Sequence, residues 1–112
     1  MSQLTTHILD TTKGKPAQGV TIVLYQQESD GWKQLAQGVT NSDGRIPDLL
    51  NKEVLLQPGA YKMKFETATY FGLQSIQTFY PYVEIVFSIT SNEHYHIPLL
   101  LNPYGYSTYR GS

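Results

Sequence analysis

The three histidines are the side chains of this chain best suited to chemistry. They stand at positions 7, 94 and 96, and imidazole exchanges protons near neutral pH. A single histidine in a strand is more often a surface or hydrogen-bonded residue than a catalyst. Two histidines that are two residues apart, with a third near the start of the chain, together indicate a site for proton transfer or for a metal ion.

Zinc binding is the metal alternative. His94 and His96 share one face of an expected strand, which would offer two nitrogens to zinc, and His7 is available as a third ligand. The motif from His94 to His96 contains no Asp or Glu, and histidine pairs at this spacing arise easily in any alternating strand. Zinc is therefore the weaker interpretation of the three histidines.

Two other segments carry polar groups that could serve a site. The turn Asn41-Ser42-Asp43-Gly44 is followed directly by Arg45, and taken alone it is a hairpin with a solvated arginine. The chain ends in Tyr109-Arg110-Gly111-Ser112, which would supply a hydroxyl and a fixed cation to a site or simply form a strand edge. The sequence has no cysteine, glycine-rich phosphate loop or nucleophile elbow, so covalent and nucleotide chemistries have no support.

Short strands are the elements that must position these residues. Turn-forming residues recur at short intervals, as in Ser29-Asp30-Gly31 and Pro58-Gly59, and they imply about eight elements. Between the turns, apolar residues alternate with others, most clearly over residues 61–65 and 83–89, with the period of a half-buried strand. The pattern predicts a single all-β domain over residues 1–112, a sandwich or a barrel, with a helical turn only near 67–73.

The expected strand over residues 94–101 is the most informative. Its two alternating faces hold Tyr95, Ile97, Leu99 and Leu101 on one side and His94, His96, Pro98 and Leu100 on the other. The first face is expected in the core. The second is half polar and half apolar, which is typical of a cleft wall or a subunit contact, so His96 is expected to point into that cleft.

Composition and charge exclude several classes of function. The 112 residues have a net charge of −1, so no field of one sign exists to attract nucleic acid or a membrane surface. Without cysteine there are no disulfides, and stability does not depend on an oxidising compartment. The first residues lack the pattern of a signal peptide and no stretch is long enough for a membrane span, so we expect a cytoplasmic location.

Four segments together resemble the transthyretin-related family of 5-hydroxyisourate hydrolases, and the resemblance runs from Leu4 to Ser112. The segments are LTTHILD at 4–10, TNSDGR at 40–45, HYHIPLLL at 94–101 and STYRGS at 107–112. The carrier branch of the family, transthyretin, is similar over 79–87 and 102–104. It lacks the counterparts of His7, Arg45 and His96 and the Tyr-Arg-Gly-Ser ending, all of which are present here.

The resemblance implies a fold, an assembly and an activity. The fold is a transthyretin-like two-sheet sandwich of about eight strands with one short helix, and the assembly is a homotetramer with its sites in a channel between dimers. The activity is hydrolysis of the ring amide of 5-hydroxyisourate, the product of urate oxidation, to 2-oxo-4-hydroxy-4-carboxy-5-ureidoimidazoline, without a cofactor. The alternative that the same resemblance leaves open is a carrier of a small hormone-type ligand without catalysis.

The resemblance also implies roles for particular residues. His7, Arg45 and His96 form the catalytic set, and substrate binding adds the last four residues, Tyr109, Arg110, Gly111 and Ser112. Because the ring amide is already activated, the two histidines need only activate water and deliver a proton, and Arg45 is an anchor or oxyanion partner. Two interacting imidazoles titrate as a pair, so the base stays unassigned. His94 is left outside the set.

Overall fold

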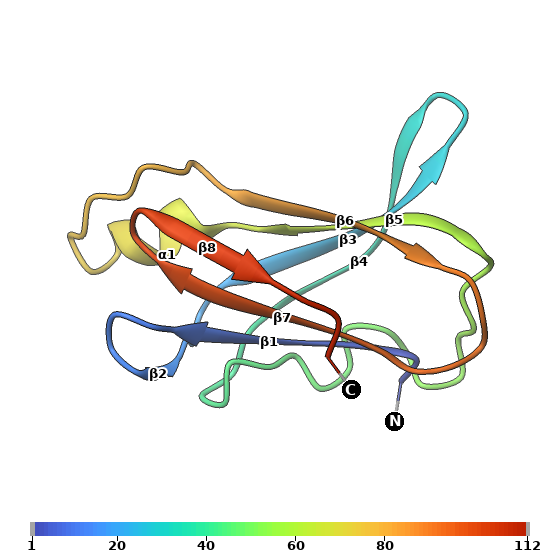
Figure 1. Cartoon of the computed structure of the whole chain (residues 1–112), viewed down its shortest axis with the longest axis horizontal. Helices are drawn as coiled ribbons and strands as arrows, with labels where there is room; N and C mark the ends of the chain where they lie inside the picture. Colours follow the sequence, from blue (N-terminus) through green and yellow to red (C-terminus); the bar gives the residue numbers. More distant parts are fainter. Residues whose placement is uncertain (1, 112) are drawn as a thin grey trace.

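Two four-stranded β-sheets pack face to face in a computed structural model that describes residues 2–111 (Figure 1). The first sheet has the order β2-β1-β7-β8, with β1 (Leu4–Asp10), β2 (Lys15–Pro16), β7 (Tyr95–Asn102) and β8 (Gly105–Thr108). The second sheet has the order β4-β3-β5-β6, with β3 (Thr21–Glu28), β4 (Gly31–Val39), β5 (Gly59–Phe65) and β6 (Val83–Ile89). The predicted all-β fold is confirmed, as a sandwich rather than a barrel.

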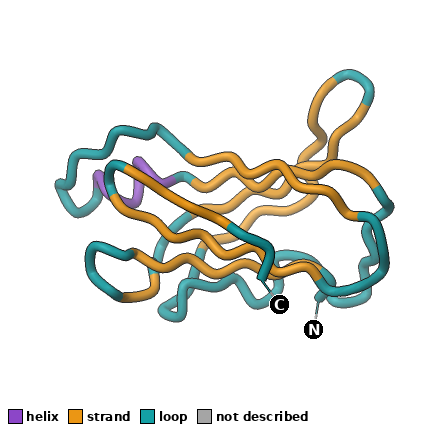
Figure 2. The backbone as a smooth tube through the Cα atoms, viewed as in Figure 1, coloured by secondary structure: helices purple, strands orange, loops and turns teal. Residues whose placement is uncertain are grey.

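One short helix, α1 (Thr67–Gly72), follows β5 at one end of the sandwich, inside the range where a helical turn was expected (Figure 2). The buried Tyr70 hydroxyl fixes it by donating a hydrogen bond of 2.7 Å to Oδ2 of the buried Asp10 at the end of β1. Burial, together with this bond, raises the pKa of Tyr70 to about 12. Within the described residues, no helix combines the length and apolar character needed to cross a membrane.

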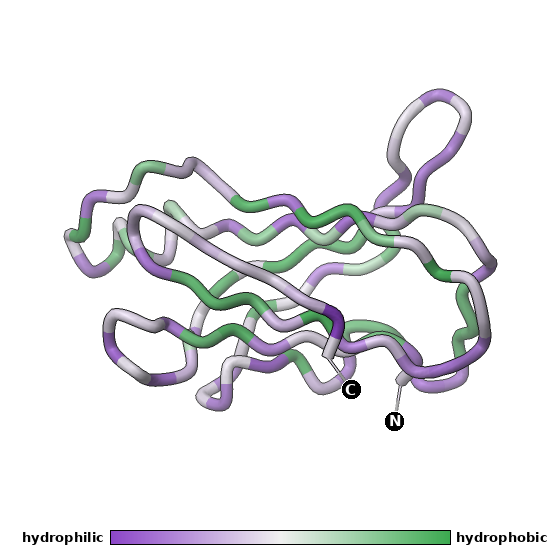
Figure 3. Tube along the Cα trace, in the orientation of Figure 1, coloured by the Kyte–Doolittle hydropathy of each residue, from purple (hydrophilic) through white to green (hydrophobic). Residues whose placement is uncertain are grey.

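The core lies between the sheets and follows the predicted alternation. On β7 the inward residues are almost fully buried, with Leu99 at 0% and Leu101 at 2% exposure, and Figure 3 shows the same strand as largely hydrophobic. β6 follows the pattern only in part, because Ile85 and Phe87 are half-buried between two buried ends. These two side chains line a cleft at the open edge of the sandwich.

Parallel pairing of β1 with β7 is the feature of the fold that positions the histidines. His7 stands opposite Pro98, and Thr5 stands opposite His96. A parallel pair requires a long crossover, and here the chain between the two strands forms the whole second sheet. Residues that are about 90 positions apart in the sequence therefore meet on one outer face of the first sheet.

Candidate active site

His7 and His96 lie on this outer face, each half-buried. Their strands are neighbours and their registers differ by two residues. A strand spacing of about 4.8 Å and a two-residue rise of about 6.6 Å place their Cβ atoms roughly 8 Å apart. That separation leaves room between the rings for a water molecule or the edge of a small planar ligand.

The loop that carries Arg45 is docked directly onto β1. The Ile8 amide donates a hydrogen bond of 2.9 Å to the Gly44 carbonyl. The Asn41 side-chain oxygen accepts bonds from the amides of Asp43, at 2.9 Å, and Arg45, at 3.2 Å. Gly44 has a φ of +72°, and a Cβ there would lie 2.5 Å from the Ile8 carbonyl oxygen. The loop therefore lies closer to β1 than a residue with a Cβ atom at position 44 would allow, and this close contact holds Arg45 beside His7.

Gly44→Ala is expected to destabilise the protein by about 1–3 kcal/mol, because the left-handed backbone is strained and the methyl group collides with β1. Urea unfolding measures this cost. Gly14→Ala is the matched control, since Gly14 has a similar φ of +66° but no atom within 4 Å of its Cβ position. If the two variants have equal unfolding midpoints, the close contact between the loop and β1 does not contribute to the free energy of unfolding.

The electrostatics of this face keep both imidazoles uncharged near neutral pH. Burial, and next the positive charge of Arg45, lower the pKa of His7. A hydrogen bond to the Asp43 backbone and the charge of the Asp43 carboxylate oppose this and raise the pKa. Burial lowers the pKa of His96 as well, followed by the charges of Arg45, His94 and His7. Arg45 thus acts on both rings at once, so the face presents two neutral proton acceptors beside one fixed cation.

The ring of His96 is held on two sides. Its Nδ1 lies 2.8 Å from the Thr5 hydroxyl. On the other side, the Gly111 amide donates a bond of 2.8 Å to the His96 carbonyl, and a Cβ on Gly111 would come within 2.5 Å of Cδ2 of the ring. The remaining nitrogen, Nε2, is bonded to Cδ2 and lies next to the C-terminal segment. His96 therefore has one nitrogen engaged by Thr5, and within residues 2–111 no hydrogen bond occupies the other.

Gly111→Ala is expected to lower kcat for the reaction proposed below by about 10-fold or more while leaving stability nearly unchanged. The added methyl group must displace the His96 ring, and a catalytic group misplaced by about 1 Å lowers the rate by up to about 100-fold. Steady-state rates and thermal unfolding measure the two effects. Gly105→Ala is the control in the same hairpin, where the new Cβ meets only Asn102, at 3.6 Å. Full activity in the Gly111 variant would show that this contact does not fix the ring.

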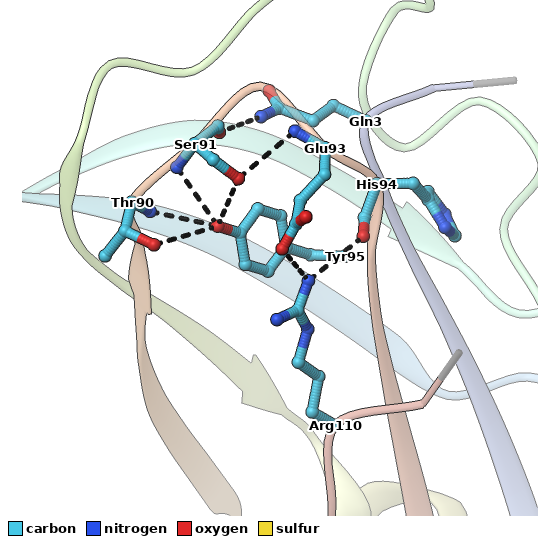
Figure 4. Close-up of polar contacts among 7 residues, drawn as sticks. All are labelled: Gln3, Thr90, Ser91, Glu93, His94, Tyr95 and Arg110. Atoms are coloured by element: carbon cyan, nitrogen blue, oxygen red, sulfur yellow. Dashed lines mark hydrogen bonds and ion pairs between the residues drawn. The ribbon is translucent and has the colours of Figure 1, made fainter.

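Two of the predicted binding residues lie apart from the rings of His7 and His96, although Arg110 reaches the His94 carbonyl oxygen at 3.5 Å. Tyr109 and Arg110 line a cleft of about 460 Å³ at the open edge, between β6 and the end of β8. The Arg110 guanidinium pairs with the Glu93 carboxylate at 2.6 Å and lies 4.3 Å from the centre of the Tyr95 ring. Figure 4 shows the His94 imidazole pointing away from this guanidinium. Ser112 lies outside the described residues. Roles for Tyr109, Arg110 and Ser112 in binding substrate stay predictions.

Thr5 is the polar neighbour of the histidines that sequence reasoning missed. Its hydroxyl lies 2.8 Å from His94 Nε2 and 2.8 Å from His96 Nδ1. A threonine in an alternating strand gives no signal by itself, and only the parallel register with β7 creates the contact. Within residues 2–111, no three His, Cys, Asp or Glu side chains are grouped as a metal site requires.

Fold and site together define a class of protein: a transthyretin-type sandwich with a histidine and arginine cluster on the outer face of one sheet. The chain belongs to the HIUase/Transthyretin family, whose model matches residues 4–111.

Three similar proteins show both branches of that family. A 5-hydroxyisourate hydrolase of Salmonella typhimurium is 51% identical over 110 residues, which cover 97% of this chain and 80% of the relative. The structure of Klebsiella pneumoniae 5-hydroxyisourate hydrolase superposes with a TM-score of 0.86 at 39% identity, covering 100% of this chain and 94% of the other. Transthyretin from Sparus aurata superposes with a TM-score of 0.91 at 34% identity, covering 99% and 97%.

Proposed function

We propose that this chain hydrolyses the ring amide of 5-hydroxyisourate. The observation that carries the proposal is the meeting of His7, Arg45 and His96 on one face, with two neutral imidazoles beside a fixed cation. The names of the relatives support it, because proteins up to 51% identical are called 5-hydroxyisourate hydrolase. General acid–base catalysis needs groups of this kind, placed within reach of one water molecule.

The reaction proceeds by attack of water on the ring carbonyl carbon. One imidazole takes a proton as the water oxygen bonds to carbon, and the guanidinium of Arg45 stabilises the resulting oxyanion through charge-assisted hydrogen bonds. The carbon–nitrogen bond of the ring then breaks, and the proton passes to the departing nitrogen. The products are a carboxylic acid, which gives its remaining proton to the solvent and becomes a carboxylate, and an opened ring, as in 2-oxo-4-hydroxy-4-carboxy-5-ureidoimidazoline. The protein returns to its starting protonation state.

The carrier alternative has less support. Fold cannot separate the branches, since a transthyretin superposes as well as a hydrolase does. Function has to be argued from the site, and here the outer face places titratable groups, His7 and His96, among its apolar side chains. A carrier would bind a thyroid-hormone-like ligand to saturation and leave 5-hydroxyisourate decaying at its spontaneous rate.

We also propose that the chain assembles as a homotetramer, with the outer face of the first sheet turned toward another copy. The family resemblance supports this assembly, and so do large apolar side chains left exposed near the sheet edges. These include Val86 at 59%, Tyr104 at 63% and Tyr109 at 59% exposure. Burying them between copies would be favourable. Sedimentation velocity should show a species of four chains, and a stable monomer would contradict a shared channel.

Water labelled with ¹⁸O tests whether the chain accelerates cleavage of the ring amide, because the attacking water oxygen ends in the new carboxylate. 5-Hydroxyisourate is made from urate with urate oxidase in ordinary water and then diluted into H₂¹⁸O with a catalytic amount of the chain. The proposal predicts that a product with one ¹⁸O in its new carboxylate accumulates faster than in the protein-free control. Product that forms only at the control rate, in the presence of folded protein, would reject the proposed function.

A further inference from the structure

The contact of Thr5 with two histidines, described above, is not used by the mechanism. We propose that Thr5 and His94 hold His96 in the tautomer with its proton on Nδ1, so that Nε2 is the base that activates water. The inference rests on the proposed function and deepens it, because it assigns the base between His7 and His96. Thr5 and His94 are positioning residues in this view, since they act through His96.

Hydrogen-bond counting links the protons of the three side chains. The Thr5 hydroxyl carries one proton and lies 2.8 Å from a ring nitrogen on each side. It can therefore donate to one histidine while accepting from the other. If it donates to His94 Nε2, it accepts from His96 Nδ1–H, and His96 Nε2 keeps its lone pair. If it donates to His96, the proton of that ring is on Nε2, which then cannot act as a base.

The main chain of Thr5 favours the first arrangement. Besides its hydroxyl, Thr5 presents its main chain to the His96 imidazole as the residue directly opposite in the register, and this backbone group raises the pKa of His96, against the larger effect of burial. A backbone group that stabilises the protonated ring must be the carbonyl, because a carbonyl can only accept. Nδ1 is the nitrogen turned toward Thr5. The carbonyl thus draws the His96 proton to Nδ1 and away from Nε2, and the hydroxyl is then able to accept from the same nitrogen.

His94 completes the arrangement by accepting the hydroxyl proton of Thr5. Its ring lies nearly parallel to that of His96, with an angle of 22° between their planes and 6.4 Å between their centres. At that separation the two rings do not bond each other directly, so Thr5 is the link between them. The orienting group next to a catalytic imidazole commonly fixes its tautomer, as the carboxylate does in the serine protease triad.

Nitrogen NMR of the imidazoles tests the tautomer without any substrate. Long-range ¹H–¹⁵N spectra above neutral pH distinguish a protonated Nδ1 from a protonated Nε2. The proposal predicts Nδ1–H for His96 in the wild type and in Thr5→Ser, and a shift toward Nε2–H in Thr5→Val, which keeps the shape but lacks the hydroxyl. His96 protonated on Nε2 in the wild type would overturn the proposal.

Kinetics test whether the tautomer matters. Loss of a group that orients a metal-bound histidine lowers activity or metal affinity by about 10- to 100-fold. We expect a fall in kcat of that size for Thr5→Val, with KM nearly unchanged. Activity should be largely restored in Thr5→Ser. Thr11→Val is the matched control, because the Thr11 hydroxyl, just after β1, donates to the Leu101 carbonyl of β7, and within residues 2–111 it makes no hydrogen bond to a histidine. It is expected to keep wild-type activity.

The outcomes separate this inference from the proposed function. If the wild type fails to accelerate hydrolysis at all, the proposed function is wrong and the base assignment is overturned with it. If the wild type is active but Thr5→Val has unchanged kcat, or loses kcat with the His96 tautomer unchanged, the positioning role alone is wrong. A loss of kcat that follows the tautomer and is restored in Thr5→Ser supports it.

Discussion

His96→Asn is expected to lower kcat for 5-hydroxyisourate hydrolysis by about 10²- to 10⁴-fold, the range that loss of a general base commonly produces. Asparagine keeps hydrogen bonding and approximate size, but it cannot take a proton from water. Because the side chain lies on the outer face and is only half-buried, folding should be preserved. Stopped-flow ultraviolet absorbance measures the rate, and circular dichroism confirms the fold.

His94→Asn is the informative comparison. Without His94, the Thr5 hydroxyl can still accept from His96 and donate to the asparagine side chain or to water, so the loss should stay within about 10-fold. A His96 variant that turns over as fast as the wild type would remove this residue from the chemistry. A larger loss in the His94 variant than in the His96 variant would reverse their roles.

Arg45→Ala is expected to cost about 10²- to 10³-fold in kcat, as does the removal of one oxyanion donor in other hydrolases. Arg45→Lys should recover only part of this, since an ammonium group lacks the planar fork that matches adjacent carbonyl oxygens. Steady-state kinetics of the two variants measure the difference. Equal activity of the lysine variant and the wild type would show that charge alone is needed.

The same substitution carries a prediction about pH. Arg45 lowers the pKa of both His7 and His96 through its charge, so its removal raises both values toward that of a free imidazole. The neutral imidazoles are then protonated at a higher pH. The acid limb of the kcat/KM profile should therefore move upward in Arg45→Ala. A limb that stays in place, or moves downward, would show that neither histidine beside Arg45 is the base.

Local periodicity is the reason why much of the fold was predictable. Alternation in 94–101 placed Leu99 in the core and His96 on the outer face, and both assignments hold because side-chain direction in a strand depends only on the parity of the position. The helical turn near 67–73 was also expected from the pattern, whereas the choice of a sandwich came from family resemblance. Periodicity alone left sandwich and barrel open, since it does not say which strands pair.

The geometry of the candidate site depends on contacts that no local pattern contains. The register of β1 with β7 brings Thr5 between two histidines, and strand pairing across some 90 residues leaves no trace in either segment. Arg45 is placed by the approach of Gly44 to the Ile8 carbonyl. Its loop resembles any exposed hairpin when it is considered alone. Arg110 likewise meets Glu93 and Tyr95 through tertiary packing.

The decay of 5-hydroxyisourate tests hydrolysis at this site most directly. The compound is generated from urate with urate oxidase, and its ultraviolet absorbance is followed with no protein, with a catalytic amount of the wild type and with the same amount of Arg45→Ala. We predict many turnovers by the wild type, with decay well above the spontaneous rate, and near-spontaneous decay with the variant. Decay at the spontaneous rate with folded wild-type protein would contradict hydrolysis and leave the carrier as the better interpretation.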